Sequence, residues 1–297
     1  MTTTIWEPVP VAAPRSDALL WVNDLRHLAP DYLRRWFHPT AQGLDVRTLA
    51  RALRGAAPDV AAHVLDSIDP GLAAEVRAYG DEPVSRTEIF QAQLAVTTVY
   101  FWEMAYHGHP EVYEQFSALQ QPPLDDMFPP EQFRGLDVAD VGTGSGRLLV
   151  HLAGHAARLI GIDPCRPLLA LAGATVPDAE LLEGGFDRLP LPDASVDVVV
   201  SHGAYQISEE RGGERGLAEV RRVLRPGGRG LLAVPNPATS AHLRGLGVRE
   251  IPVNGGIRWS PAPPDAPALL HHLLRLGQVD YDEALGGTPV CLFEIRP

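Results

Sequence analysis

From Leu136 onward the chain alternates short apolar runs with stretches of helical spacing, and this alternation restricts its possible folds more than any other feature. Seven such runs begin at residues 136, 158, 179, 196, 228, 278 and 289: "LDVADVG", "RLIGID", "AELLEG", "VDVVVS", "GRGLLAVPN", "QVDYDEAL" and "PVCLFEI". Continuous apolar strands alternating with helices are typical of a mostly parallel sheet covered on both faces. We therefore predict an α/β fold with a doubly wound, mostly parallel, seven-stranded sheet.

The region before this alternation has a different pattern. Residues 16–121 contain Ala-, Leu- and Arg-rich segments that follow a Ser or Asp and are separated by Pro or Gly. Their apolar residues recur every three or four positions, which predicts capped helices. "SRTE" at Ser85 is a capping box, and we expect its helix to extend to about Tyr106. The sequence thus predicts an N-terminal all-helical cap (residues 1–121), a Pro-rich connector from residue 122, and a core domain (122–297).

Composition and charge limit the classes of function. No apolar run is long enough to span a bilayer, so we expect no membrane association. The net charge of −12 opposes a phosphate backbone, which favours a small-molecule substrate over a nucleic acid. The first 17 residues show no secretory leader, and two distant cysteines suit a reducing compartment, so we expect a cytoplasmic protein.

The stretch "VADVGTGSGRLLV", residues 138–150, places glycines on alternate positions directly after the first predicted strand. In a doubly wound sheet the ligand binds beyond the carboxyl ends of the strands, so this turn is the expected cradle. Glycine lets the backbone approach a ligand closely. The dinucleotide fingerprint needs a sixth-position glycine, and Arg147 stands there, which disfavours a pyrophosphate ligand. Asp163 ends the next predicted strand, where a carboxylate can accept both hydroxyls of an adenosine ribose.

These residues resemble the class I S-adenosylmethionine (SAM)-dependent methyltransferases. Four motifs coincide in order and spacing: "DVGTGSG", the acid in "GIDP", "LPLPDASVDVVVS", and "VRRVLRPGGRGLLAVPN". The resemblance covers roughly residues 112–297. It implies that SAM serves as methyl donor, that no metal is needed, and that the acceptor is a small metabolite, as in secondary metabolism.

The resemblance also implies a cofactor-binding set. Asp140 would hold the SAM ammonium through the loop, and Asp163 would bind the ribose. Many relatives carry an acid where this chain has Gly185, so here the backbone of Phe186 and the side chain of Asp187 are the substitutes for contacting the adenine. The whole set is Asp140, Gly142, Thr143, Gly144, Gly146, Asp163, Pro164, Phe186, Asp187 and Ser201.

Catalysis at a sulfonium mainly requires alignment of a nucleophile and exclusion of water, so a general base is optional. His202 and Tyr205 follow the fourth strand, where an imidazole could take a proton from an acceptor; a hydrogen-bonded wall residue is the alternative. The aromatic segment 99–116 could pack the helices, but aromatic faces also attract a sulfonium. Tyr113 and Trp102 are its leading active-site candidates.

Three alternatives are left open. His151 and His155 lie one helical turn apart, but no third ligand is placed, so we expect a solvated face rather than a metal site. Within the same fold, some relatives of the azetidine-2-carboxylate synthase type cyclise the aminobutyrate arm of SAM and release methylthioadenosine. A non-catalytic SAM-binding protein is the third possibility. The oligomeric state is not predicted.

Overall fold

A computed structural model describes residues 19–80, 82–208 and 211–297. The chain forms two compact units, Met1–Val112 and Tyr113–Pro297, and the boundary between them along the sequence falls within helix α7 (Pro110–Leu119). The expectation that the chain carries no secretory leader falls on residues 1–17, which lie outside the described part. Among the described residues no helix is both long and apolar enough to cross a membrane.

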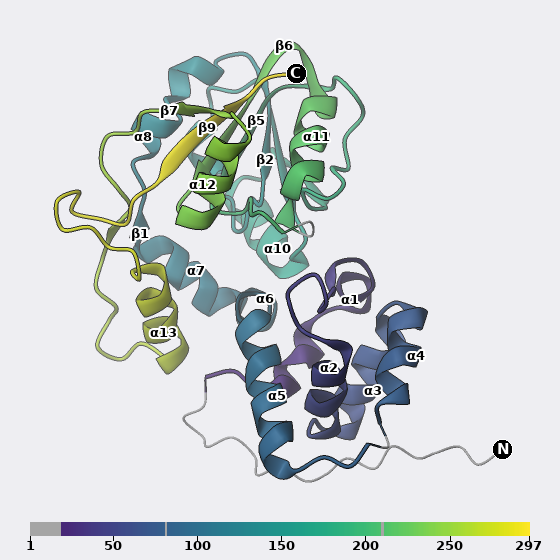
Figure 1. Ribbon diagram of the computed structural model, residues 1–297. Helices are drawn as coiled ribbons and strands as arrows, with labels where there is room; N and C mark the ends of the chain where they lie inside the picture. The colour runs from purple at the N-terminus through teal and green to yellow at the C-terminus, as the bar shows by residue number, and fades with distance from the viewer. Residues whose placement is uncertain (1–18, 81, 209–210) are drawn as a thin grey trace. The chain divides into compact units, whose positions relative to one another are not determined.

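The first unit is helical, as predicted (Figure 1). Helices α2 and α5 begin where capping residues were expected: the Asp45 side chain accepts a hydrogen bond from Thr48 N at 2.6 Å, and Ser85 and Glu88 form the capping box. The elements are η1 (Val22–His27), α1 (Pro30–Trp36), α2 (Val46–Arg54), α3 (Pro58–Ser67), α4 (Pro70–Ala78), α5 (Arg86–Val99) and α6 (Phe101–Gly108).

The single helix predicted from Ser85 to Tyr106 is wrong, because it is interrupted at Tyr100. The preceding run Val96–Val99 is entirely β-branched, and such residues lose side-chain freedom in a helix. The buried Tyr100 ring stacks on Phe37 with centroids 4.3 Å apart. A stacked aromatic pair of this kind contributes about 0.5–1.5 kcal/mol beyond area burial, enough to offset a local break in the helix.

The second unit contains the predicted seven-stranded sheet, in the order β4-β3-β2-β5-β6-β9-β7. Neighbouring strands from β4 to β6 are parallel, whereas β9 is antiparallel to both β6 and β7. The strands are β2 (Asp137–Val141), β3 (Arg158–Asp163), β4 (Glu180–Glu183), β5 (Val196–His202), β6 (Leu224–Val234), β7 (Arg249–Ile251) and β9 (Cys291–Ile295).

Helices cover both faces of this sheet. On one face, Val138 and Val200 pack with Leu148 and Leu152 of α9 (Arg147–Leu152). On the other face, Ala139 and its neighbours pack against helices α11 (Gly213–Val223) and α12 (Pro237–Gly245). Helix α10 (Arg166–Thr175) lies against β3 and β4. Side chains of successive strand residues point to opposite faces, so near-continuous apolar strands fill both layers.

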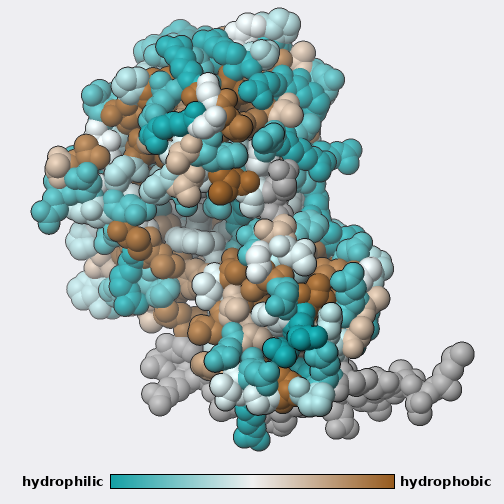
Figure 2. Space-filling model, in the orientation of Figure 1, coloured by the Kyte–Doolittle hydropathy of each residue, from teal (hydrophilic) through white to brown (hydrophobic). Residues whose placement is uncertain are grey.

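Two elements differ from the sequence prediction. The predicted strand at residues 278–285 is absent; this segment follows α13 (Ala268–Gly277) as turns, with Val279, Tyr281 and Leu285 exposed. Figure 2 shows apolar side chains on the surface in this region. The seventh strand is instead β7, which is only three residues long and so too short to give a periodic signal.

The predicted connector is packed rather than extended. It forms two short helical segments, α8 (Leu124–Met127) and η2 (Pro130–Phe133), and it buries Met127, Phe128 and Phe133 against the sheet. Residues Gln120–Gln121 (β1) pair with Arg258–Trp259 (β8) in a separate two-stranded sheet.

Candidate active site

The glycine loop joins β2 to α9 at the carboxyl edge of the sheet. Gly142 N and Thr143 N both donate to the carbonyl of Ile162, which fixes the loop to the end of β3. Gly144 has φ +56°, and a Cβ built there would meet no described atom within 4 Å. By contrast, a Cβ on Gly142 would come within 2.0 Å of the Ala204 Cβ. Gly142 is therefore required for packing, whereas Gly144 faces open space that a side chain would fill.

Asp163 ends β3 and is directly connected to this loop. Its Oδ2 accepts a hydrogen bond from Gly144 N at 2.9 Å, and its Oδ1 accepts one from Cys165 N at 2.8 Å. Burial raises the pKa of Asp163 to about 6, although the two backbone N–H groups oppose the shift. A carboxylate can accept about four hydrogen bonds, so Asp163 retains capacity for a ligand.

Asp140 is a second buried carboxylate, on β2 next to the loop. Its Oδ1 has no hydrogen-bond partner among the described residues. Burial raises the pKa of Asp140 to about 7, and the negative charge of Asp163 adds to the shift. Two neighbouring buried carboxylates, one with an unpaired oxygen, favour a cationic ligand.

The other predicted cofactor residues differ in how far they are buried. Thr143 and Ser201 are buried; the Thr143 hydroxyl lies beside the Asp140 carboxyl group, and the Ser201 hydroxyl has no hydrogen-bond partner among the described residues. Pro164 and Asp187 are partly exposed. Phe186 is buried in the sheet core, where its ring packs edge-on against Tyr205. The SAM contacts of all these residues stay predictions.

The predicted catalytic residues occupy contrasting environments. His202 ends β5; burial lowers the pKa of its imidazole to about 3, with the charge of Arg147 contributing, and its buried Nε2 has no described partner. The Tyr205 hydroxyl donates to the carbonyl of Gly213 at 2.7 Å, inside the core. These contacts favour a structural role for Tyr205, and its catalytic role stays a prediction.

The two aromatic candidates belong to different units. Tyr113 is the first residue of the α/β unit. Burial raises the pKa of its hydroxyl to about 12, and the negative charge of Asp163 contributes, so the hydroxyl lies within electrostatic range of Asp163. Trp102 lies on α6 of the helical unit, edge-on against Phe101. The role of Trp102 stays a prediction.

The sequence interpretation missed a group of residues around α7. Arg147 opens α9, and its Nη2 donates to the backbone carbonyl of Ser117 and to Ser117 Oγ, the latter at 2.6 Å. An arginine in the first turn of a helix opposes the helix dipole. That unfavourable placement was the available signal that Arg147 serves something other than helix stability.

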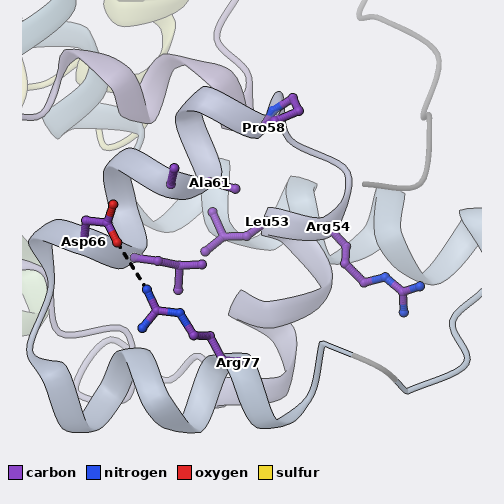
Figure 3. Close-up of a pocket in the computed structure, with 8 residues that line it drawn as sticks. Leu53, Arg54, Pro58, Ala61, Asp66 and Arg77 are labelled. Atoms are coloured by element: carbon purple, nitrogen blue, oxygen red, sulfur yellow. Dashed lines mark hydrogen bonds and ion pairs between the residues drawn. The ribbon is translucent and has the colours of Figure 1, made fainter. Parts of the chain in front are cut away.

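A pocket of about 260 Å³ lies in the helical unit, between α2, α3 and α4. Its lining is mostly apolar, and Arg77 is paired with Asp66 at 3.2 Å across it (Figure 3). Arg54 donates from Nη1 to the carbonyl of Glu82. The pocket contains none of the predicted site residues. No group of three potential metal ligands occurs within the described ranges.

Comparison with known proteins relates part of the α/β unit to methyltransferases. The sequence profile of the methyltransferase domain family matches residues 139–232, which include the loop, both acids and His202. A probable S-adenosylmethionine-dependent methyltransferase of Mycolicibacterium smegmatis is 40% identical over 106 residues, covering 35% of this chain and 40% of that protein. The malonyl-[acyl-carrier protein] O-methyltransferase of Methylococcus capsulatus is 36% identical over 110 residues, covering 35% of this chain and 39% of that protein.

Among solved structures, a complex of the Haloferax volcanii Trm112 methyltransferase activator with a methyltransferase is 21% identical. The structural alignment covers 64% of this chain and 95% of the matched chain of the complex, with a TM-score of 0.43. This chain spans about two fifths of the length of the curated relatives that it matches. Residues 139–232 are a methyltransferase domain, similar in sequence to SAM-dependent methyltransferases.

Proposed function

We propose that the whole chain binds SAM at the glycine loop and transfers its methyl group to a small-molecule acceptor. The observation that carries this proposal is the pair of buried acids: Asp140 has an unpaired oxygen, and Asp163 is hydrogen-bonded to the loop. Such acids suit a ligand with an ammonium, a sulfonium and ribose hydroxyls. The open side of Gly144 suits close approach of that ligand to the backbone.

In this proposal, different residues of the chain bind different parts of SAM. Asp163 accepts hydrogen bonds from the ribose hydroxyls, and Asp140 attracts the ammonium. Pro164, Phe186 and Asp187 lie around the adenine. SAM supplies an activated methyl group, so the protein needs only to orient the acceptor and exclude water.

His202 holds a hydrogen bond in this scheme rather than moving a proton. A base whose pKa is about 3 is a weak proton acceptor at neutral pH. Its buried Nε2 can instead accept a hydrogen bond from the acceptor and orient it. A nucleophile that needs no proton removed before it attacks fits this environment.

A small-molecule acceptor is supported by the net charge of −12, which disfavours a nucleic acid. The Methylococcus capsulatus relative is named for an acceptor attached to a carrier protein. The test must therefore distinguish a free acceptor from a protein-bound one.

The experiment incubates the purified chain with methyl-deuterated SAM, first alone, then with a metabolite extract passed through a 3-kDa filter, and finally with the protein fraction of that extract that the filter retains. We expect S-adenosylhomocysteine and a deuterium-labelled small molecule only when the extract is present. Label found exclusively on acyl-carrier protein would refute the small-molecule acceptor. Formation of methylthioadenosine and azetidine-2-carboxylate from SAM alone would show that the enzyme cyclises SAM and does not transfer its methyl group.

A further inference from the structure

The segment that begins at the end of α13, residues 276–287, exposes several apolar side chains. Val279 is 72% exposed and Tyr281 is 48% exposed, and Leu276 and Leu285 are exposed as well. Single apolar residues scattered over a surface are normal, but several in one short segment indicate a contact surface. The 276–287 segment therefore presents an apolar surface that the described residues leave uncovered.

Hydrogen bonds hold this segment in a defined conformation. Asp282 N donates to the carbonyl of Gly287 at 3.0 Å, and Gly287 N donates to the carbonyl of Asp282 at 3.2 Å. Between these two residues, Oδ1 of Asp282 accepts a hydrogen bond from Ala284 N at 2.8 Å. A surface that is ordered before it binds loses less conformational entropy on binding. The segment is thus suited to insert a side chain into a partner.

The same segment is acidic. Asp280, Asp282 and Glu283 are exposed, and none of them forms an ion pair with a described residue. Residues 276–287 include no arginine or lysine that could balance these charges. Charged groups across an interface are normally arranged so that opposite signs meet. We therefore expect the partner surface to combine an apolar recess with basic side chains.

The pocket between α2, α3 and α4 of the helical unit is such a recess. Its apolar lining includes the buried side chains of Leu53, Ala61 and Leu65 (Figure 3). Its volume of about 260 Å³ is smaller than the roughly 300–1,000 Å³ of pockets for drug-sized ligands. The pocket therefore suits a single large side chain.

Arginines supply the basic groups of this pocket. Arg77 is paired with Asp66, whereas the Arg54 guanidinium extends away from the apolar lining and donates to the carbonyl of Glu82 (Figure 3). Arg54 forms no ion pair with a described residue, so two arginines of the lining face one aspartate. Consecutive Cα atoms are about 3.8 Å apart, so an acid directly beside an inserted side chain lies within electrostatic range of these arginines.

We propose that the 276–287 segment of one copy of the chain binds the α2–α3–α4 pocket of a second copy, with the ring of Tyr281 inserted. The ring covers the apolar lining, and the hydroxyl reaches the ion pair between Arg77 and Asp66. The two acids that flank Tyr281 face the arginines. Tyrosine is enriched among the residues that dominate the binding energy of interfaces.

A second copy fits this contact because each chain has both complementary surfaces, one segment and one pocket. Two copies that exchange both contacts form a closed dimer, in which the same surfaces are used on each side. The second contact then forms within an existing complex, which makes the dimer more stable than one small contact alone. This association goes beyond the proposed function and does not depend on it.

Sedimentation equilibrium of the full chain over a wide concentration range measures the association. We expect the wild-type mass to rise from that of one chain to that of two. Tyr281→Ala should raise the dimer dissociation constant at least tenfold, because the inserted ring is lost. Leu246→Ala removes another exposed apolar side chain of the α/β unit, so it is the matched control and should dimerise like wild type.

A second variant fills the pocket instead. Ala62 lines the pocket and is exposed, so Ala62→Phe occupies the recess without changing the core. This variant should also raise the dissociation constant at least tenfold. Ala74→Phe, at an exposed position of α4 outside the lining, should leave it unchanged. High salt should weaken the wild-type dimer, because it screens the acids from the arginines.

A mixture of the two defective variants tests which surfaces meet. The Tyr281→Ala chain keeps an intact pocket, and the Ala62→Phe chain keeps an intact segment. With a fluorescent label on one of them, sedimentation should show a heterodimer that is tighter than the homodimer of either variant.

Three results overturn the proposal. A wild-type chain that stays monomeric at every concentration excludes a contact between copies. A dimer that either variant leaves unchanged has a different interface. A mixture that associates no more tightly than the separate variants shows that the segment and the pocket do not bind each other.

Discussion

The backbone N–H of Gly144 donates a 2.9 Å hydrogen bond to Oδ2 of Asp163, so the loop after β2 is held by the acid that ends β3. One side chain therefore sets the conformation of the loop and also faces the proposed ribose position. Loss of the Asp163 carboxylate should affect both loop order and ligand binding.

Asp163→Asn should weaken S-adenosylhomocysteine binding by about 1.5–3 kcal/mol, roughly 10- to 150-fold, because hydrogen bonds to a charged acceptor are lost. Calorimetry measures this directly. Asp178→Asn, at an exposed position of the same unit, serves as the control and should bind like wild type. Equal affinities for Asp163→Asn and wild type would remove Asp163 from the site.

Gly144→Ala should abolish ligand binding while costing only about 1 kcal/mol of stability. Its φ of +56° disfavours any Cβ, but no protein atom within the described ranges obstructs one. Gly154→Ala is a matched control, since Gly154 has φ +77° and equally open surroundings. Thermal melts should show similar small losses for both variants, and only Gly144→Ala should fail to bind S-adenosylhomocysteine. Wild-type affinity in Gly144→Ala would show that the ligand does not approach this glycine.

Asp140→Asn should stabilise the ligand-free chain above neutral pH. The folded-state pKa of Asp140, about 7, is above that of an unfolded aspartate, so the folded state retains a proton between pH 4 and 7 that the unfolded state releases. This acid therefore lowers stability as the pH rises through that window. Removing it should add roughly 1–4 kcal/mol at pH 8.

Urea denaturation of both proteins at pH 5 and pH 8 tests this prediction. The gain in unfolding free energy should be larger at pH 8, and the variant should lose S-adenosylhomocysteine binding. A variant less stable than wild type at pH 8 would indicate that the Asp140 carboxylate is fully satisfied in the folded protein.

Acid should destabilise the helical unit through His107. Burial lowers the pKa of His107 to about 3, below the ordinary value of 6.5, so unfolding takes up a proton at intermediate pH. Its stabilising contribution is complete above pH 6.5 and is lost as the pH falls. We expect a loss of about 2 kcal/mol between pH 6.5 and 5.

His107→Phe keeps an aromatic ring beside Tyr32, whose centroid lies 4.5 Å from that of the imidazole. Denaturation of this variant should be less sensitive to pH over the same range. His155→Phe, at a partly exposed position of the other unit, should leave the wild-type pH dependence intact. The same pH slope in His107→Phe and wild type would exclude His107 as the source.

Much of this fold could be predicted from the sequence because local signals and tertiary structure agree. The apolar runs at β2, β3, β5 and β6 are buried on both faces, so their composition alone identifies them as parallel strands. The capping box at Ser85 is a local interaction and forms as predicted. The break at Tyr100 depends on a partner, Phe37, that is distant in sequence.

The candidate site likewise contains residues that the sequence predicts and residues that only the fold reveals. Asp140, Gly144 and Asp163 follow from their positions at strand ends. Arg147 and Glu114 could not be found by spacing, since only the fold reveals that their charged atoms are buried and unpaired. The segment at residues 278–285 shows the converse: it has apolar residues but no neighbouring strand with which to pair.

The proposed function requires that the glycine loop bind a SAM-type ligand and not a dinucleotide. Calorimetric titration of the full chain with S-adenosylhomocysteine and, separately, with NAD distinguishes the two. We expect saturable binding of S-adenosylhomocysteine at one site per chain and no binding of NAD. Saturable binding of NAD, or no binding of S-adenosylhomocysteine, would contradict it.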